Sequence, residues 1–186
     1  MPSGLASLRL ALRTSPSEAA KAVRVLARSH RGAKGLPALL AVARALWKGT
    51  GSEQDLALLL LASHLRWLEG DHWKEFKGWV RRARSPAILD RLAADLLGTL
   101  VRKDRGWCTV LRNWTRSPDA RERRAAVGAL IPRVRQMADV ESALGVAADL
   151  RADPDAGVRE AAAGLLKEML SADRLLVLEF LRRCRR

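Results

Sequence analysis

The segments SPDARERRAAVGAL (residues 117–130) and DPDAGVREAAAGLL (residues 153–166) repeat one pattern. Pro, Asp, Ala, Arg, two further Ala, Gly and Leu coincide between them without a gap. A third segment, SPAILDRLAADLLG (residues 85–98), shares the Ser-Pro start, one arginine and the paired alanines. Self-similarity of this kind indicates equivalent helices of a repeat protein, in which small residues let neighbouring helices pack closely.

Helix starts recur along the chain at a nearly constant interval. Pro is favoured at the first helical position, and a preceding Ser or Asp side chain can accept a hydrogen bond from a free N–H group. The predicted N-caps are Ser15, with Glu18 placed for a capping box, Ser52, with Asp55 in the first turn, Ser85, Ser117 and Asp153. The intervals are 37, 33, 32 and 36 residues, and each holds two helices with their turns.

The chain is therefore predicted to be one all-α domain over residues 1–186, a HEAT-like helical-repeat solenoid, or α-α superhelix. Ala, Leu and Arg dominate, and β-branched residues are sparse, which favours helices over strands. Pro132 is expected to end the helix that begins at Ser117. The other expected helices cover residues 3–13, 36–48, 71–83, 106–116, 139–151 and 172–184.

The charge of the chain is strongly positive, with 34 Lys+Arg against 20 Asp+Glu and a formal net charge of +14. Residues 1–51 hold nine basic side chains and one acid, Glu18, and the chain closes on Arg182-Arg183-Cys184-Arg185-Arg186. Cationic surface suits DNA because it releases counterions from the phosphate backbone. It also suits acidic proteins and anionic membranes, so charge favours DNA without deciding the partner.

Cysteine usage and hydropathy predict a cytoplasmic protein that binds no membrane. Cys108 and Cys184 are isolated, so no disulfide framework is implied and a reducing compartment fits. The purest apolar run, residues 57–62, is too short to span a bilayer. The first 17 residues are basic and lack acids, which suggests either a transit peptide or a capping first helix. We expect a monomer.

No catalytic or metal-binding motif stands out. His30, His64 and His72 have no metal-ligand spacing with each other or with either cysteine, and they are interpreted as surface residues. The chain contains no Gly-x-Ser-x-Gly elbow, no Walker A loop and no dinucleotide fingerprint. We expect no metal and no cofactor.

Three of the tryptophans, Trp67, Trp73 and Trp79, lie in the stretch that should form the second helical hairpin. Trp73, Phe76 and Trp79 follow an i, i+3 spacing and share one helix face. This stripe is interpreted as core rather than as a platform for stacking bases.

An ordered set of weaker signals runs with near-constant spacing from about residue 36 to the C-terminus. The residues are Ala45-Leu46-Trp47, Asp90 with Gly98, Trp114 with Ser117, Arg123-Arg124-Ala125, and Ala161 through Lys167-Glu168. In this order they resemble the AlkD-type DNA alkylation-repair family, a superfamily of HEAT-like repeat DNA glycosylases. Each signal is weak alone, and the resemblance depends on the set.

The resemblance implies an activity and a mechanism. Members of this family hold duplex DNA on a basic concave surface and excise N3- or N7-alkylated purines. The lesion base is cationic and already a good leaving group, so an aspartate that stabilises the oxocarbenium-like transition state suffices without a general acid. The damaged base need not leave the helix, in contrast to most base-processing enzymes.

Transferred residue by residue, the resemblance places Asp90 at the catalytic aspartate and Arg124 at the assisting arginine. Two positions that carry tryptophan in the family are Pro86 and Gly164 here, and neither residue can offer the cation–π contact of an indole. The candidate DNA-binding residues are Arg81, Arg82, Arg84, Arg121, Arg123, Arg124 and Arg159.

Asp90 also has a structural interpretation. It lies five residues after its predicted N-cap, the offset of Glu122 and Val158 in the next two repeats, and could pair with Arg91 or Arg124. Charge networks of this kind perturb carboxylates as readily as catalysis does.

Two functions from different classes follow. The first is binding of duplex DNA with little sequence preference, with or without excision of a damaged base. The alternative is a HEAT-repeat scaffold that binds a protein and has no repair activity. A basic groove would favour DNA, whereas an apolar groove with a polar rim would favour protein.

Overall fold

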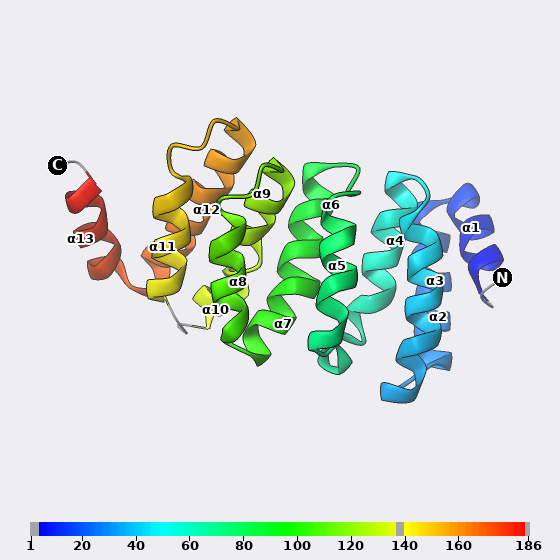
Figure 1. The fold of residues 1–186 in the computed structure, drawn as a ribbon. Coiled ribbons are helices and arrows are strands. Elements are labelled where there is room, and N and C mark those ends of the chain that lie inside the picture. Colours follow the sequence, from blue (N-terminus) through cyan, green and yellow to red (C-terminus); the bar gives the residue numbers. More distant parts are fainter. Residues whose placement is uncertain (1–3, 137–139, 185–186) are drawn as a thin grey trace. The chain divides into compact units, whose positions relative to one another are not determined.

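The computed structural model describes residues 4–136 and 140–184. The described residues form helices and turns and contain no strand (Figure 1), which confirms the predicted all-α helical-repeat fold. They divide into two compact units. Unit 1 comprises Met1–Glu69 and Arg82–Ile88, and unit 2 comprises Gly70–Arg81 and Leu89–Arg186.

Unit 1 consists of helical hairpins. Its elements are α1 (Leu5–Thr14), α2 (Pro16–Ser29), η1 (Ala33–Gly35), α3 (Leu36–Trp47), α4 (Gly51–Ala62) and η2 (Leu65–Trp67). The helices α1 with α2 and α3 with α4 pack as pairs around buried leucines, and α2 also packs on α4. The buried Gln54 holds residues 82–88 in this unit, because its amide nitrogen donates to the Arg82 carbonyl and its oxygen accepts from the Arg84 backbone N–H at 2.9 Å each.

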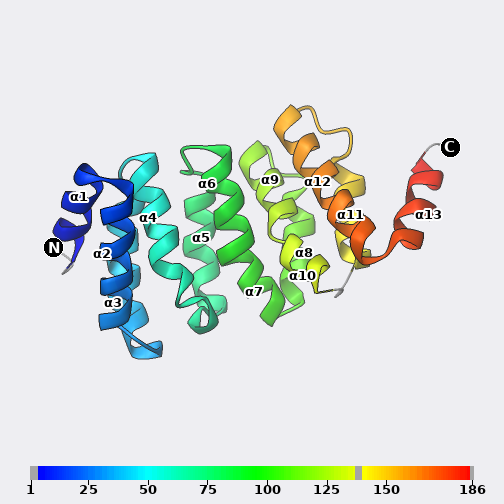
Figure 2. The same ribbon diagram turned by 180° about the vertical axis from the view of Figure 1, so that it is seen from behind.

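The helices of unit 2 continue the same pattern. They are η3 (Gly70–His72), α5 (Trp73–Val80), η4 (Leu92–Leu97), α7 (Gly98–Lys103), α8 (Gly106–Trp114), α9 (Ala120–Gly128), α10 (Ile131–Arg135), α11 (Val140–Leu150), α12 (Ala156–Ala172) and α13 (Arg174–Cys184). In both views α8 lies beside α11, and α9 lies beside α12 (Figures 1 and 2). Unit 2 therefore has two helix layers, in which α9 and α12 occupy equivalent places.

A long helix has a π-helical middle. It begins with α6 (Pro86–Arg91), continues through the π-helical turn η4 and ends with α7. Ser85 caps its start by accepting from the Ile88 backbone N–H at 3.2 Å. π-helical turns are rare and occur frequently at functional sites, and this one begins directly after Asp90 and Arg91.

The predicted tryptophan stripe is confirmed as core. Trp73 and Trp79 are each 6% exposed, and Phe76 is fully buried. Trp73 stacks on Trp107 with ring centroids 4.2 Å apart and tilts against Trp114 at 5.3 Å. Trp73, Trp79 and Trp114 are therefore interior packing in unit 2 and are not available to stack on bases.

The predicted helix starts are confirmed at Ser15 and Ser85 and are wrong at three other positions. Ser15 accepts from the Glu18 backbone N–H. The fourth helix is capped by Thr50, with Glu53 completing a capping box, instead of by Ser52. The helices after Ser117 and Asp153 start two residues late, with Asp119 and Asp155 as their N-caps.

The late starts have a physical cause. Ser117 and Asp153 accept from the backbone N–H groups of Asp119 and Asp155, so each closes a short turn before its helix. Their remaining hydrogen-bonding capacity goes to other side chains. A Ser-Pro-Asp or Asp-Pro-Asp sequence therefore offers two caps, and the second begins the helix.

The remaining boundaries agree with the predictions within a few residues. The helices α3, α8, α11 and α13 match their expected ranges, while Ser3, Asp139, Arg185 and Arg186 lie outside the described residues. Pro132 does not end the helix after Ser117. That helix stops at Gly128, and Pro132 lies in the first turn of α10, where a missing N–H costs nothing.

The surface interpretation of the histidines is wrong for His64. This residue is 3% exposed, and its Nε2 lies 2.7 Å from the His30 carbonyl oxygen. The carbonyl can only accept, so Nε2 donates, and the other ring nitrogen lies 2.9 Å from the Ser63 hydroxyl.

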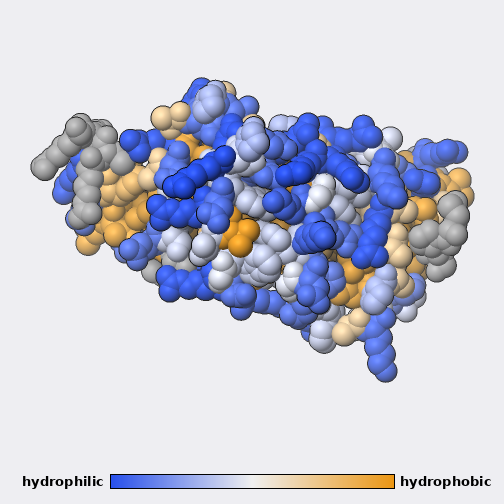
Figure 3. Space-filling view, viewed as in Figure 1, coloured by the Kyte–Doolittle hydropathy of each residue, from blue (hydrophilic) through white to orange (hydrophobic). Residues whose placement is uncertain are grey.

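Most of the face seen in Figure 1 is hydrophilic (Figure 3). Hydrophobic surface lies over α13, where the Leu175 side chain is exposed. Across the described part of the chain, no helix combines the length and the hydropathy needed to cross a membrane.

Candidate functional site

Asp90 and Arg124 form a bidentate ion pair. Arg124 donates from Nε to Asp90 Oδ1 and from Nη2 to Oδ2, each at 2.7 Å. The Nη1 group of Arg124 donates to the Gly157 carbonyl oxygen, also at 2.7 Å. One guanidinium therefore ties together α6, α9 and the first turn of α12, the helices that carry the three repeated segments.

Exposure is unequal within this pair. The Arg124 side chain is 16% exposed, whereas the Asp90 side chain is 46% exposed. Hydrogen bonding to Asp90 raises the pKa of Arg124, while burial opposes the rise and the charges of Asp90, Glu160 and Asp155 add to it. The site thus presents an accessible carboxylate, positioned by a permanently charged arginine that is largely covered.

Two glycines make room for the pair. A Cβ on Gly157 would lie 2.9 Å from Arg124 Nη1, and a Cβ on Gly128 would lie 2.9 Å from the Ala93 side chain. Contacts below 3.0 Å force a shift, so a larger residue at either position would move the guanidinium or separate α9 from η4. Gly128 and Gly157, which the sequence presents only as small residues of the repeat, thus set the geometry around Asp90.

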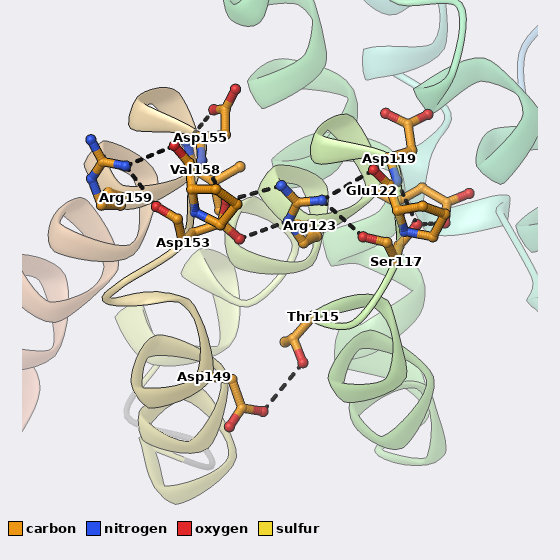
Figure 4. Close-up of polar contacts among 12 residues, drawn as sticks. Thr115, Ser117, Asp119, Glu122, Arg123, Asp149, Asp153, Asp155, Val158 and Arg159 are labelled. Atoms are coloured by element: carbon orange, nitrogen blue, oxygen red, sulfur yellow. Dashed lines mark hydrogen bonds and ion pairs between the residues drawn. The ribbon is translucent and has the colours of Figure 1, made fainter.

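Arg123, the neighbour of Arg124, faces the turn between repeats (Figure 4). Its Nε and Nη2 atoms donate to the two carboxylate oxygens of Asp153 at 2.7 and 2.9 Å. Its Nη1 group donates to the Ser117 and Pro118 carbonyl oxygens. Nε, Nη1 and Nη2 of Arg123 thus each donate at least one hydrogen bond to an oxygen of the protein.

Arg159 repeats part of this arrangement one repeat later (Figure 4). Its Nη1 group donates to the carbonyl oxygens of Asp153 and Pro154 at 2.6 and 3.0 Å. These are the counterparts, 36 residues on, of the carbonyls that Arg123 binds. Unlike Arg123, Arg159 is exposed, and it forms no ion pair with a described carboxylate. The shared contacts show that α9 and α12 are equivalent helices.

Arg81, at the end of α5, lies beside Arg121, in the first turn of α9. Arg81 Nε pairs with Glu122 Oε1 at 2.7 Å, and Arg121 Nη1 donates to the Arg81 carbonyl oxygen. Burial would raise the pKa of Glu122, but hydrogen bonds from Ser117 and Arg81 outweigh it and lower the pKa. Both arginines remain exposed, and Arg121 lies one turn from Arg124 on α9.

The family comparison decides what kind of protein carries these residues. The family described as DNA alkylation repair enzyme matches residues 19–186. The chain belongs to this family. No curated protein matches the chain. Family membership gives the protein a role related to DNA repair, as the resemblance predicted.

The candidate catalytic and DNA-binding residues divide between the two units. Asp90, Arg81, Arg121, Arg123, Arg124 and Arg159 lie in unit 2, and Arg82 and Arg84 lie in unit 1. Arg84 Nε donates to the Gly49 carbonyl oxygen at 2.6 Å. Of the two partners suggested for Asp90, Arg124 is the one that binds it.

Neither of the two positions at which the resemblance predicts tryptophan has an aromatic side chain. Pro86 is exposed at the first position of α6 in unit 1. Gly164 is exposed on α12, and a Cβ built there would meet no atom within 4 Å.

Sequence reasoning missed three participants in these contacts. The Gly157 carbonyl oxygen, the Asp153 carboxylate and the buried Glu122 bind Arg124, Arg123 and Arg81, and the sequence nominated none of the three as an arginine partner. The 36-residue offset between Arg123 and Arg159 could have shown that both arginines cap equivalent turns. No local signal indicates that Arg124 also binds the Gly157 carbonyl oxygen.

Proposed function

We propose that the chain binds duplex DNA with little sequence preference through cations around α9 and the start of α12. Three exposed arginines support this: Arg81, Arg121 and Arg159 each use one nitrogen within the protein and keep other N–H groups without a partner among the described residues. Such forked donors suit phosphate oxygens. Arg82 and Arg84 of unit 1 are further candidates for phosphate contacts.

Arg124 and Arg123 have different places in this proposal. Arg124 uses three of its five N–H donors on Asp90 and Gly157, so two remain for a phosphate. Arg123 is directed into the turn, where both Asp153 oxygens and two carbonyls take its donors. We propose that Arg123 supports the fold and does not bind DNA directly.

The exposure of Asp90 supports a second candidate function, excision of a cationic N3- or N7-alkylated purine. Each Asp90 oxygen accepts one hydrogen bond from Arg124 and has a further lone pair. A carboxylate fixed in this way can stabilise the positive charge that develops on the sugar as the glycosidic bond breaks. The missing aromatic residues at Pro86 and Gly164 weigh against lesion recognition, so we place DNA binding first.

An excision assay separates the two functions. Duplex DNA with one 7-methylguanine would be incubated with the wild type, with Asp90→Asn and with Asp149→Asn. Asp149 is a matched control, because it is a partly exposed carboxylate 3.7 Å from Arg112 in the other helix layer of unit 2. Base release by the wild type and Asp149→Asn, reduced about 100-fold or more in Asp90→Asn, would support excision. No release by the wild type leaves DNA binding alone.

A salt titration tests DNA binding itself. Labelled duplexes of two unrelated sequences should bind with similar affinity, and log K should fall with log salt by about 0.9 for each phosphate contacted. Binding that is absent at low salt, or independent of salt, would favour the protein-scaffold alternative. That residues 1–186 act as one monomeric domain in the cytoplasm stays a prediction.

A further inference from the structure

Unit 1 contains a pocket of about 430 Å³ that shares no residue with the Asp90 site. It lies between the C-terminal halves of α2 and α4 and is closed at one side by η2. Val23, Ala27 and Leu59 supply its apolar lining, and Trp67 forms a wall. The volume is within the range of small-molecule sites.

The rim of this pocket is cationic. Arg24, Arg28, Arg31 and Arg66 line it, and none of the described lining residues carries a carboxylate. Arg24 and Arg28 lie one turn apart on α2, and Arg31 follows the end of that helix. Among the described residues these three arginines have no hydrogen-bond or ion-pair partner, and all three are exposed.

The wall of the pocket combines an indole with a guanidinium. The Arg66 guanidinium carbon lies over the Trp67 ring, 4.7 Å from the ring centroid. Trp67 is half-buried, unlike the core indoles of α5. Aromatic rings and arginine planes are the surfaces on which proteins stack unpaired bases.

Buried polar contacts fix the shape of the pocket. His64, one of the lining residues, joins the end of α4 to the end of α2 through its bond to the His30 carbonyl oxygen. Gly32 has a φ of 79°, a left-handed value that glycine adopts without strain, so the turn can place Arg31 at the rim. The site is therefore built by the fold and is not a gap between loose side chains.

We propose that this pocket binds an unpaired nucleotide of a DNA strand. The base would lie on the apolar lining and stack against the Trp67–Arg66 wall, while the flanking phosphates would bind Arg24, Arg28 and Arg31. An acidic peptide could use the same cations, but only a nucleic-acid strand supplies a planar base beside every anionic phosphate. The observations therefore favour a nucleic-acid strand over an acidic protein.

The test compares two DNA ligands by fluorescence anisotropy. One is a labelled blunt duplex, and the other is the same duplex with a five-nucleotide single-stranded extension. The variants are Trp67→Ala, Trp67→Phe and Arg24→Gln/Arg28→Gln. Arg13→Gln/Lys48→Gln is the matched control, because it removes two exposed charges of unit 1 that do not line the pocket. Circular dichroism would confirm that each variant is folded.

The wild type should bind the extended duplex more tightly than the blunt one. Trp67→Ala should reduce affinity for the extended duplex by roughly 5-fold or more, the loss expected for one stacked base, and should leave blunt-duplex binding unchanged. Trp67→Phe should keep most of the preference. The Arg24→Gln/Arg28→Gln variant should lower the salt slope for the extended duplex by about 1.4, from two single-strand phosphates.

Several outcomes would overturn the proposal. These are equal wild-type affinity for both duplexes, an unchanged preference in Trp67→Ala, or equal effects of the pocket and control charge pairs. Displacement of the extended duplex by a polyglutamate peptide, with equal efficiency in wild type and Trp67→Ala, would instead indicate an acidic protein partner. For each protein, the affinity for the extended duplex is compared with that for the blunt duplex. If the proposed duplex binding at unit 2 fails, blunt-duplex binding will be weak but the extended duplex will still bind more tightly. Failure of the pocket proposal and failure of the duplex proposal are therefore distinguishable.

Discussion

Arg123 and Arg124 are consecutive on α9, yet they form two ion pairs with different consequences. Arg123 binds Asp153 with side chains 12% and 4% exposed, whereas Arg124 binds Asp90 with side chains 16% and 46% exposed. Both arginines are bidentate and largely covered. The difference lies in the carboxylate, which is buried in one pair and open to solvent in the other.

This contrast shows how one helix can supply both stability and a site. Hydrogen bonding by Arg123 lowers the pKa of Asp153, burial opposes this, and the Asp155 backbone N–H adds to the lowering. A buried carboxylate in such a network serves the fold, because it cannot reach a ligand. An accessible carboxylate held by the same kind of partner is positioned for chemistry but contributes less to stability.

The largest effect is expected from breaking the buried pair. Asp153→Ala leaves Arg123 with two charged donors unmatched and should lower the free energy of unfolding by about 3 kcal/mol. Asp90→Ala should cost less than about 1 kcal/mol, because half of its side chain is already in water. Urea unfolding of both variants measures the difference. Equal losses would contradict the division between the pairs.

The second largest effect is expected from acid, which should protonate the buried carboxylates of Asp153 and Glu122 and lower the free energy of unfolding. The pKa of Asp153 is lowered from 3.8 and that of Glu122 from 4.5, so their contribution to stability is present above these values and is lost as pH falls through the lower native values. We expect unfolding free energy to drop below about pH 4. In Asp153→Asn the drop should be smaller, whereas a full-sized drop in that variant would assign the acid sensitivity elsewhere.

A smaller effect is expected from a substitution that shifts Arg124 but leaves the Arg124–Asp90 ion pair in place. In Gly157→Ala the new Cβ would meet Arg124 Nη1 at 2.9 Å, so the guanidinium must shift from the Gly157 carbonyl oxygen. The expected stability loss is about 1 kcal/mol, the value of one hydrogen bond. Gly164→Ala is the control, since a Cβ there meets nothing within 4 Å. Thermal unfolding of both variants would show whether Gly157 is special.

The smallest effect concerns the two equivalent arginines of the repeat turns. Arg159→Gln should lower the slope of log K against log salt for duplex DNA by about 0.9, the contribution of one phosphate, with little change in stability. Arg123→Gln should destabilise unit 2 instead. A variant of Arg159 that unfolds early and keeps the full salt slope would give both arginines the same structural role.

Sequence reasoning predicted much of the fold and less of the site. The repeated segments, the tryptophan stripe and most helix ranges followed from local spacing, which neighbouring residues determine. The caps at Thr50, Asp119 and Asp155 were missed because two side chains, two residues apart, could each begin the helix. Asp90 and Arg124 could be named as candidates, but Asp90 had two possible arginine partners, and burial could not be read from the sequence.

The sequence by itself determined that the chain is an all-α helical-repeat protein, because the periodicity, caps and small residues are encoded within each segment of roughly 35 residues. The tertiary structure alone decided what each arginine does. The carboxylate that binds Arg124 belongs to Asp90, 34 residues earlier in the chain. The carboxylate that binds Arg123 belongs to Asp153, 30 residues later. Adjacent side chains on a helix point in different directions, so only the packing of successive repeats assigns one to the turn and the other to Asp90.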